Sequence, residues 1–351
     1  MFVLTAQDIN RLLDKVGLNS VMDTLIEKTE DALRDFSDET IAISQRSGFN
    51  DKGLVEWMPV SIKGKFVVIK VVSYFPENPA SYKLATIQAV SSRYDYDNGQ
   101  VTDMVEGGLL TAIRTGAASA VASRVLARPD SSILGLVGCG AQSVTQAHAI
   151  SRCFPIREIL TFDVCPDAHR SIVQRLAFLG IKVRSCTLEE LEANSDIICT
   201  ATSTNVGDPP VLNGDNLKPH VHINAVGSDY HGKTELPLSF VKQALVVPDH
   251  REQAAFEGEC QRLDADEIGP ELHNVLRHAQ DFYSWRDRWT VFDSTGIPLE
   301  DAIALDTVCA LAKKMKIGTH LNFNHAYDDP KNPYEFSKST LHTHALLDAV
   351  A

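Results

Sequence analysis

A short run of small residues is the first sign of chemistry in the sequence. Gly138, Gly140 and Ser143 take the three defined positions of a G-x-G-x-x-G/A motif, directly after the apolar run 133–137. The first glycine allows a tight turn, and the second allows backbone N–H groups to approach a pyrophosphate. A small third residue allows the following helix to pack on the strand. The pattern predicts a buried strand, a phosphate-binding turn and a helix, in that order.

An acidic residue follows at a suitable distance. Asp163 closes the next apolar run, 25 residues after Gly138. A carboxylate at the end of the second strand of such a unit accepts hydrogen bonds from both adenosine ribose hydroxyls, and its charge repels a 2′-phosphate. We therefore predict that the chain binds NAD in preference to NADP. The alternative, an ordinary glycine-rich turn, is disfavoured because strand, turn, helix, strand and acid occur in the right order.

Two cations lie in apolar surroundings, where a charge is costly unless it is used. Lys70 interrupts the run VVIKVV, and Arg114 lies in the helical sequence LLTAIRTGAASA. A guanidinium fork and an ammonium group together suit the carboxylate of a small ligand. The alternative for Lys70 is a lysine on the outer face of a half-exposed strand. The alternative for Arg114 is a structural pair with an internal carboxylate.

Three more charged residues are candidates for the same site. Arg46 follows a predicted strand in SQRSGF, Glu56 lies in LVEWMP, and Asp229 follows the predicted strand INAVG at its carboxyl end. Ligands of open α/β sheets bind at that end of the strands, so Asp229 is expected beside the nicotinamide. The alternatives are a capping or turn aspartate for Asp229 and an edge-strand charge for Glu56.

The elements that position these residues fall into two groups. Two amphipathic helices open the chain, the first with a Thr5-x-x-Asp8 capping box, and strands rich in β-branched and aromatic residues follow. Lys63-Gly64 and Asn98-Gly99 stand where hairpin turns belong. Residues 108–127 are expected to form a buried, small-residue-rich helix, and strands and helices alternate from there on.

This change of pattern predicts an α/β protein with two domains. Residues 1–115, completed by residues 316–351, are expected to form a substrate-binding and dimerisation domain with a mostly antiparallel or mixed sheet. Residues 116–315 are expected to form a Rossmann-type domain that binds NAD. A half-apolar sheet needs cover, so a homodimer through the first domain is expected.

Composition and charge argue against several functions. The formal net charge of −13 makes nucleic acid an unfavourable partner. Seven cysteines without a C-x-x-C pair favour reduced thiols over a zinc site, and no metal is expected. His342-Thr-His344 is interpreted as surface sequence rather than as a metal ligand pair. The sequence shows neither a leader pattern nor a long apolar stretch, which favours a cytoplasmic protein that does not enter membranes.

Taken together, these motifs resemble those of the ornithine cyclodeaminase/mu-crystallin family, and most of all its bacterial ornithine and lysine cyclodeaminases. The resemblance covers nearly the whole chain in the right order. It departs from the family at Ser228, where glycine is usual, and in a spacing from Arg46 to Glu56 that is one residue shorter than in some ornithine enzymes. The matching phrases are RSGF, EWMP, GGLLTAIRTGAASAVAS, GCGAQSVTQA, HINAVGSDYHGKTEL, FEGECQ and VFDSTG.

The resemblance implies roles for individual residues. Asp229 would be the general acid/base, with Glu56 placing the reacting amine or a water. Binding of the substrate carboxylate would fall to Arg46, Lys70 and Arg114, with Thr295 also at the substrate. The positions that would contact NAD are Thr86, Thr115, Gly138, Gly140, Ala141, Gln142, Ser143, Asp163, Thr202, Val226, Lys233 and Ser294.

The resemblance also implies an internal redox cycle without net oxidation. Hydride would leave the substrate Cα for NAD⁺, the distal amine would attack the resulting imine, ammonia would depart, and the hydride would return. L-ornithine would give L-proline and L-lysine would give L-pipecolate. Two alternatives stay open. One is a ketimine or imine reductase, or an amino-acid dehydrogenase, on the same scaffold. The other is a non-catalytic, mu-crystallin-like binding protein.

Overall fold

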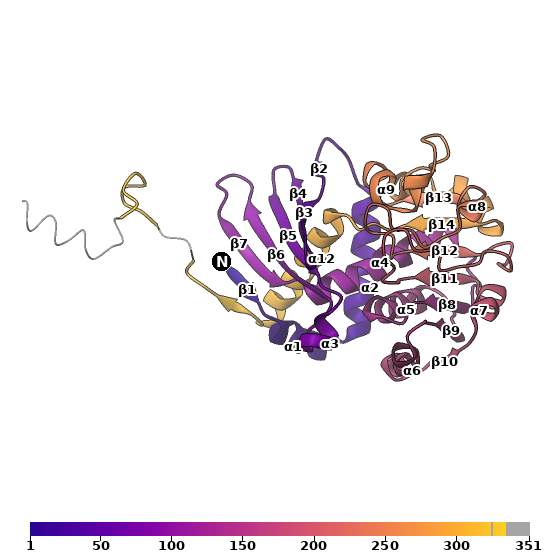
Figure 1. Cartoon of the computed structure of the whole chain (residues 1–351). Coiled ribbons are helices and arrows are strands. Elements are labelled where there is room, and N and C mark those ends of the chain that lie inside the picture. The colour runs from indigo at the N-terminus through magenta and orange to yellow at the C-terminus, as the bar shows by residue number, and fades with distance from the viewer. Residues whose placement is uncertain (324–325, 335–351) are drawn as a thin grey trace, which may run out of the picture.

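The computed structural model describes residues 1–323 and 326–334 and contains two sheets with long helices between them (Figure 1). In this part of the chain one sheet is mixed and has eight strands, while the other has seven strands, all parallel. Figure 1 shows the mixed sheet on the left, the parallel sheet on the right, and α2 and α4 between them. The predicted fold class is confirmed.

The mixed sheet is built mainly from hairpins, as the sequence predicts. Its order is β15-β1-β7-β6-β5-β4-β2, with β3 paired to β4, and only β1 and β7 run parallel. Gly64 and Gly99 take positive φ angles of 74° and 71° in the turns between β4 and β5 and between β6 and β7, so both predicted hairpins are confirmed. The short strands β1 and β3 were not predicted. The bounds are β1 Phe2–Leu4, β2 Ile41–Ile43, β3 Ser47–Asn50, β4 Leu54–Ile62, β5 Phe66–Tyr74, β6 Ile87–Asp95, β7 Val101–Glu106 and β15 Thr319–His320.

The outer face of this sheet is apolar and exposed. Trp57 lies opposite Val71 on the neighbouring strand, and Val71 lies opposite Val90 on the next. Their exposed fractions are 37%, 44% and 47%. These three large apolar side chains lie side by side on neighbouring strands and form a continuous apolar surface, which is exposed to water when the chain is alone.

Four helices belong to the N-terminal part of the chain. They are α1 Ala6–Val16, α2 Leu18–Arg34, α3 Asn78–Tyr82 and α4 Gly108–Leu126. Thr5 and Asp8 form the predicted capping box of α1. The α4 helix is buried along most of its length, because its many alanines and glycines allow α5 to pack closely: a Cβ on Gly116 would lie 2.5 Å from the carbonyl oxygen of Thr145.

The parallel sheet has the order β10-β9-β8-β11-β12-β14-β13. The chain therefore reverses direction across the sheet between β8 and β11, and the crevice at their carboxyl ends is where ligands bind in such folds. The strands are β8 Ile133–Val137, β9 Glu158–Phe162, β10 Lys182–Ser185, β11 Ile197–Thr200, β12 His222–Ala225, β13 Leu245–Pro248 and β14 Thr290–Asp293. The helices are α5 Ala141–Cys153, α6 Pro166–Arg175, α7 Leu188–Asn194, α8 Leu238–Val241, α9 Arg251–Glu257, α10 Leu272–Arg277, α11 Ala279–Phe282 and α12 Pro298–Met315, with 3₁₀ turns at Ala177–Leu179, Glu259–Arg262 and Tyr283–Asp287.

Helix α12 returns to the mixed sheet after the last strand of the parallel sheet. It packs against β4 and β5 as well as α1, α2 and α4 (Figure 1). Asp306 on α12 binds Arg93 of β6 at 3.0 Å, and Lys313 binds Asp103 of β7 at 3.0 Å. Beyond the helix, β15 pairs with β1.

The proposed domain boundaries at 115/116 and 315/316 stay a prediction. Helix α12 lies on the mixed sheet although it precedes residue 316, whereas β15 lies where the prediction puts it. Residues 324–325 and 335–351, which include His342-Thr-His344 and most of the predicted C-terminal completion of the first domain, lie outside the described residues.

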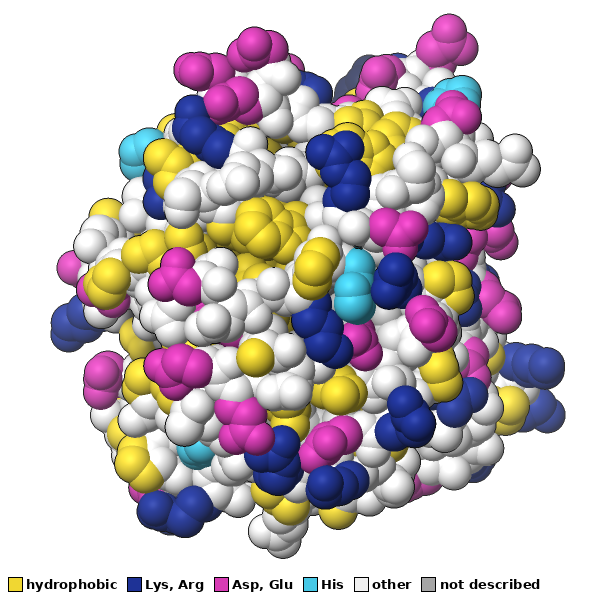
Figure 2. Space-filling model, turned by 90° about the vertical axis from the view of Figure 1, so that its right-hand side faces the viewer, with side chains coloured by type: hydrophobic (Ala, Val, Ile, Leu, Met, Phe, Trp, Pro, Cys, Tyr) yellow, Lys and Arg dark blue, Asp and Glu magenta, His cyan; other side chains and the backbone are white. Residues whose placement is uncertain are grey.

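The outer face of the parallel-sheet domain carries both signs of charge. Figure 2 views the molecule from the right of Figure 1 and shows acidic and basic side chains interspersed around a central hydrophobic strip. Among the described residues, no helix is long and apolar enough to cross a membrane.

Candidate active site

The glycine turn has the geometry that a pyrophosphate needs. Gly138 has a positive φ of 88°, and a Cβ there would lie 2.6 Å from the carbonyl oxygen of Ala201. A Cβ on Gly140 would meet no atom within 4 Å, so open space lies over the turn. Gly140 caps α5 without a side-chain hydrogen bond, which leaves the first amides of the helix available to an anion.

Asp163 lies beside this turn and already has two donors. Its carboxylate accepts hydrogen bonds from the backbone N–H groups of Cys139 at 2.6 Å and Cys165 at 2.7 Å. Each carboxylate oxygen has a further lone pair, so the group can fix the turn and still accept ribose hydroxyls. Arg175 holds the other side of the turn by donating to the carbonyl oxygen of Cys139 at 2.6 Å.

The other predicted cofactor residues gather mainly at the carboxyl ends of neighbouring strands. Thr202, Val226 and Ser294 follow β11, β12 and β14, which are adjacent in the sheet. Ser294 is buried, and its hydroxyl has no hydrogen-bond partner among the described residues, so it is free to meet a ligand. Ser143 donates to the carbonyl oxygen of Gly138 at 2.5 Å.

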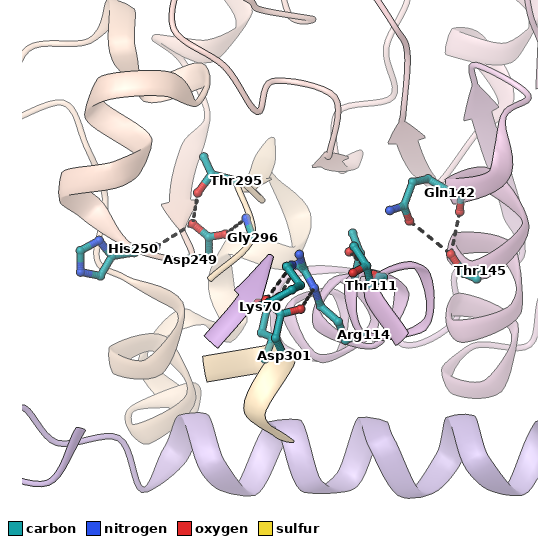
Figure 3. Close-up of polar contacts among 12 residues, drawn as sticks. Lys70, Thr111, Arg114, Gln142, Thr145, Asp249, His250, Thr295, Gly296 and Asp301 are labelled. Carbon is teal, nitrogen blue, oxygen red and sulfur yellow. Dashed lines mark hydrogen bonds and ion pairs between the residues drawn. The ribbon is translucent and has the colours of Figure 1, made fainter. Parts of the chain in front are cut away.

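The remaining predicted cofactor residues lie around the same crevice. Ala141 and Gln142 begin α5, Thr115 lies on the buried helix α4, and Lys233 lies in the loop after β12. Thr86 immediately precedes β6 of the mixed sheet. Figure 3 shows Gln142 and Thr145 on α5, apart from the cluster of Lys70 and Arg114. The open turn, the uncapped helix and the unpaired serine hydroxyl fit a dinucleotide.

Glu235 holds two of these strand ends together and was missed in the sequence. Its fully buried carboxylate accepts hydrogen bonds from Thr202, through both N–H and hydroxyl, at 2.8 and 2.6 Å, and from the N–H of Gly227 at 2.8 Å. A Cβ on Gly227 would lie 2.3 Å from the Glu235 carboxylate, so only glycine fits there. The sequence KTEL does not by itself indicate a buried acid, because the groups that bind Glu235 belong to residues 202 and 227, outside this phrase.

Lys70 and Arg114 meet at a shared carboxylate (Figure 3). Asp301 lies 2.7 Å from the Lys70 ammonium through one oxygen and 3.1 Å from Arg114 through the other. Glu300 binds Arg114 at 2.7 Å. Lys70 is only 1% exposed, so the alternative of a lysine on an exposed strand face is wrong. The internal carboxylate considered as the partner of Arg114 is present.

Burial shifts the protonation equilibria of this cluster. It lowers the pKa of Lys70 to about 8, against the attraction of Asp301, and the positive charge of Arg114 adds to the lowering. Burial also raises the pKa of Glu300 to about 7, which the charge of Arg114 opposes. For Arg114 the attraction of Asp301 and Glu300 outweighs burial and raises the pKa. At neutral pH Lys70 and Arg114 are therefore charged and Glu300 is only partly ionised, so the two carboxyl groups do not fully neutralise the two cations.

Arg46 bridges the two halves of the molecule. It donates to the carbonyl oxygens of Thr295 and Gly296, which follow β14, although it stands between β2 and β3 of the mixed sheet. Its guanidinium also forms ion pairs with Glu257 at 2.9 Å and Glu56 at 3.6 Å.

Thr295 sits in a hydrogen-bond network that fixes the same segment. Its hydroxyl donates to the buried Asp249 at 2.8 Å, and the N–H of Gly296 donates to the other Asp249 oxygen at 2.5 Å (Figure 3). Gln253 donates to the Thr295 hydroxyl at 2.8 Å. These contacts hold the carbonyl groups of residues 295 and 296 toward Arg46.

Three carboxyl groups share the space around Arg46. Burial raises the pKa of Glu56, with Arg46 opposing and Asp229 adding to the rise. Burial raises the pKa of Glu257 to about 8, and the charges of Glu56 and Asp229 contribute. Clustered carboxyl groups with raised pKa values are poised to ionise when a cation enters between them. Glu257 was not predicted as a site residue from the sequence, because the phrase FEGECQ was used only as one of the motifs that carry the family resemblance.

Asp229 is the most accessible member of this group. Its side chain is 48% exposed and pairs with Lys233 at 3.1 Å, four residues further along the loop after β12. The structure therefore places Asp229 at the carboxyl end of the parallel sheet, near the two other carboxyl groups. Within the described ranges, no group of three or more His, Cys, Asp or Glu side chains could hold a metal ion.

A Rossmann-type sheet with an open glycine turn, a buried cation pair and a carboxyl cluster defines a dinucleotide-dependent enzyme of small amino-acid-like molecules. The model of the ornithine cyclodeaminase/mu-crystallin family matches residues 7–316. The chain belongs to that family, as its motifs indicated.

Individual relatives agree with this assignment. The chain is 38% identical to L-lysine cyclodeaminase of Streptomyces rapamycinicus, over 95% of this chain and 98% of the relative. It is 29% identical to ornithine cyclodeaminase of Agrobacterium tumefaciens, over 94% and 92% of the two chains. A structure of a lysine cyclodeaminase, described as recognising L-lysine, L-ornithine and L-2,4-diaminobutyric acid, has a TM-score of 0.93 and 40% identity, over 95% of this chain and 99% of that one.

A solved reductase has the same fold. The Δ1-pyrroline-2-carboxylate reductase of Thermococcus litoralis, solved with NADH and L-proline, has a TM-score of 0.83 and 28% identity, over 92% of this chain and 100% of that one.

Proposed function

We propose that this protein is an NAD-dependent cyclodeaminase of basic L-amino acids, which converts L-lysine to L-pipecolate or L-ornithine to L-proline and releases ammonia. One observation carries the proposal. Lys70 and Arg114 form a cation cluster, and Glu56, Glu257 and Asp229 form a carboxyl cluster. Arg46 forms ion pairs with Glu56 and Glu257 and is near enough to Lys70 for its positive charge to lower the pKa of that lysine. A diamino acid has a carboxylate at one end and an ammonium group at the other, which matches both clusters.

The cation cluster would hold the substrate carboxylate. Arg114 offers a planar fork and Lys70 a point charge, and both are oriented in advance by Asp301. This preorganisation removes the cost of ordering two long side chains at the moment of binding. Arg46, held at the carbonyl oxygens of residues 295 and 296, would close the pocket from the side of the mixed sheet.

The carboxyl cluster would bind the distal ammonium group and take its proton. Ring closure requires a neutral amine, and Asp229 is the acceptor with access to solvent. Glu56 and Glu257 would stabilise the ammonium form on entry, because each carboxyl group releases its proton and the resulting carboxylate pairs with the cation.

NAD, when bound, supplies a temporary hydride acceptor, so that the net reaction is not an oxidation. The chain would hold its pyrophosphate at the amides after Gly138, its adenosine ribose at Asp163 and its nicotinamide near the ends of β11, β12 and β14. During the reaction the crevice would have to keep water away from the reacting carbon.

The alternative activity is that of an imine reductase or amino-acid dehydrogenase, in which the cofactor exchanges at each turnover. The relatives of this chain include such an enzyme, named alanine dehydrogenase, from Archaeoglobus fulgidus, which is 27% identical over 92% of this chain and 98% of the relative. The carboxyl cluster supports a substrate with a second amino group, for which alanine has no counterpart. The retained charged side chains argue against a purely binding, mu-crystallin-like role.

Incubation of the purified protein with L-lysine or L-ornithine, without added cofactor, separates these activities. A cyclodeaminase is expected to release many equivalents of ammonia per protein and an equal amount of cyclic amino acid. A reductase or dehydrogenase stops after one equivalent unless cofactor is supplied. Ammonia limited to one equivalent, with steady turnover of pyruvate and ammonia on NADH, would replace the proposal by a dehydrogenase.

The partners follow from the same surfaces. We propose a cytoplasmic homodimer formed through the outer face of the mixed sheet, where Trp57, Val71 and Val90 are exposed in register. A structure of an archaeal alanine dehydrogenase, with a TM-score of 0.83 and 27% identity, is described as a dimer with bound NAD. The acidic net charge supports the absence of a nucleic-acid partner.

A further inference from the structure

One short neighbouring segment makes several of the contacts that hold the loop carrying Asp229. We call residues 227–236, between β12 and α8, the Asp229 loop. The N–H of Gly232 donates to Gln261 at 2.7 Å, and Gln261 donates to the carbonyl oxygen of Lys233 at 2.9 Å. His231 stacks on Phe256 with ring centroids 4.9 Å apart. Residues 256–261 therefore form the surface on which the loop rests.

Glu259 is the buried acid of that surface, and it reaches both ends of the loop. It is fully buried. Its carboxylate lies 2.7 Å from the hydroxyl of Ser228 at the start of the loop and accepts from the N–H of Glu235 at 2.6 Å near its end. The N–H of Leu236 also donates to it, at 3.3 Å.

Building on the proposed function, we propose that Glu259 is a positioning residue, which fixes the positions of Asp229 and Lys233 by holding the two ends of their loop. We call its hydrogen bonds with Ser228, Glu235 and Leu236 the grip. Glu259 does not touch the predicted substrate site. The grip includes the hydroxyl of Ser228, a contact that a glycine at this position would not make.

A count of hydrogen atoms shows how the grip depends on protonation. The single hydroxyl hydrogen of Ser228 faces two acceptors, the carbonyl oxygen of Lys233 at 2.9 Å and Glu259 at 2.7 Å. Both contacts are hydrogen bonds at once only when Glu259 carries a proton and donates it to Ser228. Ser228 then donates to Lys233 and closes the turn around Asp229. Ionised Glu259 instead draws the hydroxyl hydrogen to itself.

The surroundings of Glu259 bring its ionisation close to neutral pH. Burial raises the pKa of Glu259 to about 7, against the hydrogen bonds from Glu235 N–H and Ser228. The Glu235 carboxylate on the loop raises it further, and Arg262 on the same 3₁₀ turn opposes this. Asp293 on β14 faces it as well. The turn is thus closed below about pH 7 and loosened above it.

Hydrogen exchange of the amides of residues 228–236 tests the grip without any turnover. In the wild type, after correction for the intrinsic rate, protection is expected to fall about 3- to 10-fold between pH 6 and pH 8, the size of one hydrogen bond. E259Q cannot ionise, so its protection is expected to be independent of pH. E192Q is the matched control, because Glu192 is equally buried and also accepts two backbone N–H groups, but on α7. In E192Q the protection of the amides of residues 228–236 is expected to depend on pH as it does in the wild type.

Kinetics test whether the grip acts through Asp229. E259A, which removes the whole carboxyl group, is expected to lower kcat about tenfold while KM changes less than about threefold, because the carboxylate site at Lys70 and Arg114 is untouched. S228A should also lower kcat, and the double variant S228A/E259A should be no slower than E259A. E259Q, whose amide can donate to Ser228 and accept from the N–H of Glu235 as protonated Glu259 does, should keep kcat close to that of the wild type.

Three results would overturn the proposal: a pH dependence of exchange that survives in E259Q, effects of S228A and E259A on kcat that add, or a change confined to KM. If E259Q does not fold, exchange in S228A decides the question, since loss of the hydroxyl alone must abolish the pH dependence. The exchange result stands even if the chain proves to act on another amino acid, so it is independent of the proposed reaction.

Discussion

The ammonium group of Lys70 lies 2.7 Å from a carboxylate oxygen of Asp301, with both side chains almost completely buried. Lys70 comes from the middle of β5 and Asp301 from the first turn of α12, so the contact joins segments 231 positions apart in the sequence. The acid neutralises part of the lysine charge and fixes its direction. Burial nevertheless keeps the pKa of Lys70 near 8, so its proton is held weakly.

This relationship predicts the pH dependence of substrate binding. Lys70 is charged below about pH 8 and neutral above it, because its pKa is lowered to about 8. KM for the diamino acid is therefore expected to rise above pH 8, by up to about tenfold per pH unit as the charged fraction falls. K70R is the control, since a guanidinium stays charged and should move the rise to higher pH. An unchanged KM up to pH 10 in the wild type would remove Lys70 from carboxylate binding.

The arginine of the same cluster predicts a different outcome. R114A is expected to raise KM at least tenfold with a smaller effect on kcat, because the substrate carboxylate loses a bidentate partner. The variant also leaves Glu300 and Asp301 buried without this cation, which costs about 3 to 5 kcal/mol of stability by analogy with other broken buried pairs. Thermal unfolding must accompany the kinetics. A normal KM in folded R114A would contradict the assignment.

The cofactor prediction concerns Asp163. D163A is expected to weaken NAD binding by about 1 to 3 kcal/mol, because ribose hydroxyls and the N–H groups of Cys139 and Cys165 lose a charged acceptor. Titration of NAD-depleted protein by calorimetry measures the change. D167A, at an 86% exposed side chain four residues away, is the control and should bind normally. Equal affinity in D163A, or a preference of the wild type for NADP, would exclude the role.

The sequence predicted those features whose cause is local. A glycine turn between an apolar run and a helix, hairpins at Gly64 and Gly99, and a capping box at Thr5 each depend on residues that are neighbours in the chain. Charges in apolar runs marked Lys70 and Arg114 as residues that need partners.

The partners themselves were not predicted, because they are distant in sequence. Asp301 and Glu300 look like ordinary acids in the first turn of a helix, which is a favourable place for them regardless of any site. Glu235, Glu257 and Glu259 look like surface residues of polar loops until the fold buries them. Strands β1 and β3 escaped prediction because each has only three or four residues and is stabilised by pairing with distant strands.

The exposed apolar surface on the mixed sheet predicts that the protein is a homodimer. V71E places a charge at the centre of the surface formed with Trp57 and Val90, and the cost of burying it should shift a dimer to monomers. Sedimentation velocity over a range of concentrations measures the state. V173E is the control, at an equally exposed valine on α6 (43%). A wild type that sediments as a monomer at every concentration would refute the proposed dimer.

The most direct test of the chemistry is D229N. Asparagine keeps the shape of the side chain and its place in the loop, but it cannot accept a proton. If Asp229 takes the proton of the distal ammonium group, D229N is expected to lower kcat about 10²- to 10⁴-fold, the usual effect of removing a positioned acid/base. KM should change much less, because Lys70 and Arg114 still hold the carboxylate. D208N, in the exposed loop after β11, controls for a general effect of losing an acid near the crevice. Ammonia release by D229N within a few-fold of the wild type would end this assignment. Glu257 and Glu56, whose raised pKa values place their protons in the same pocket, would then become the bases to test.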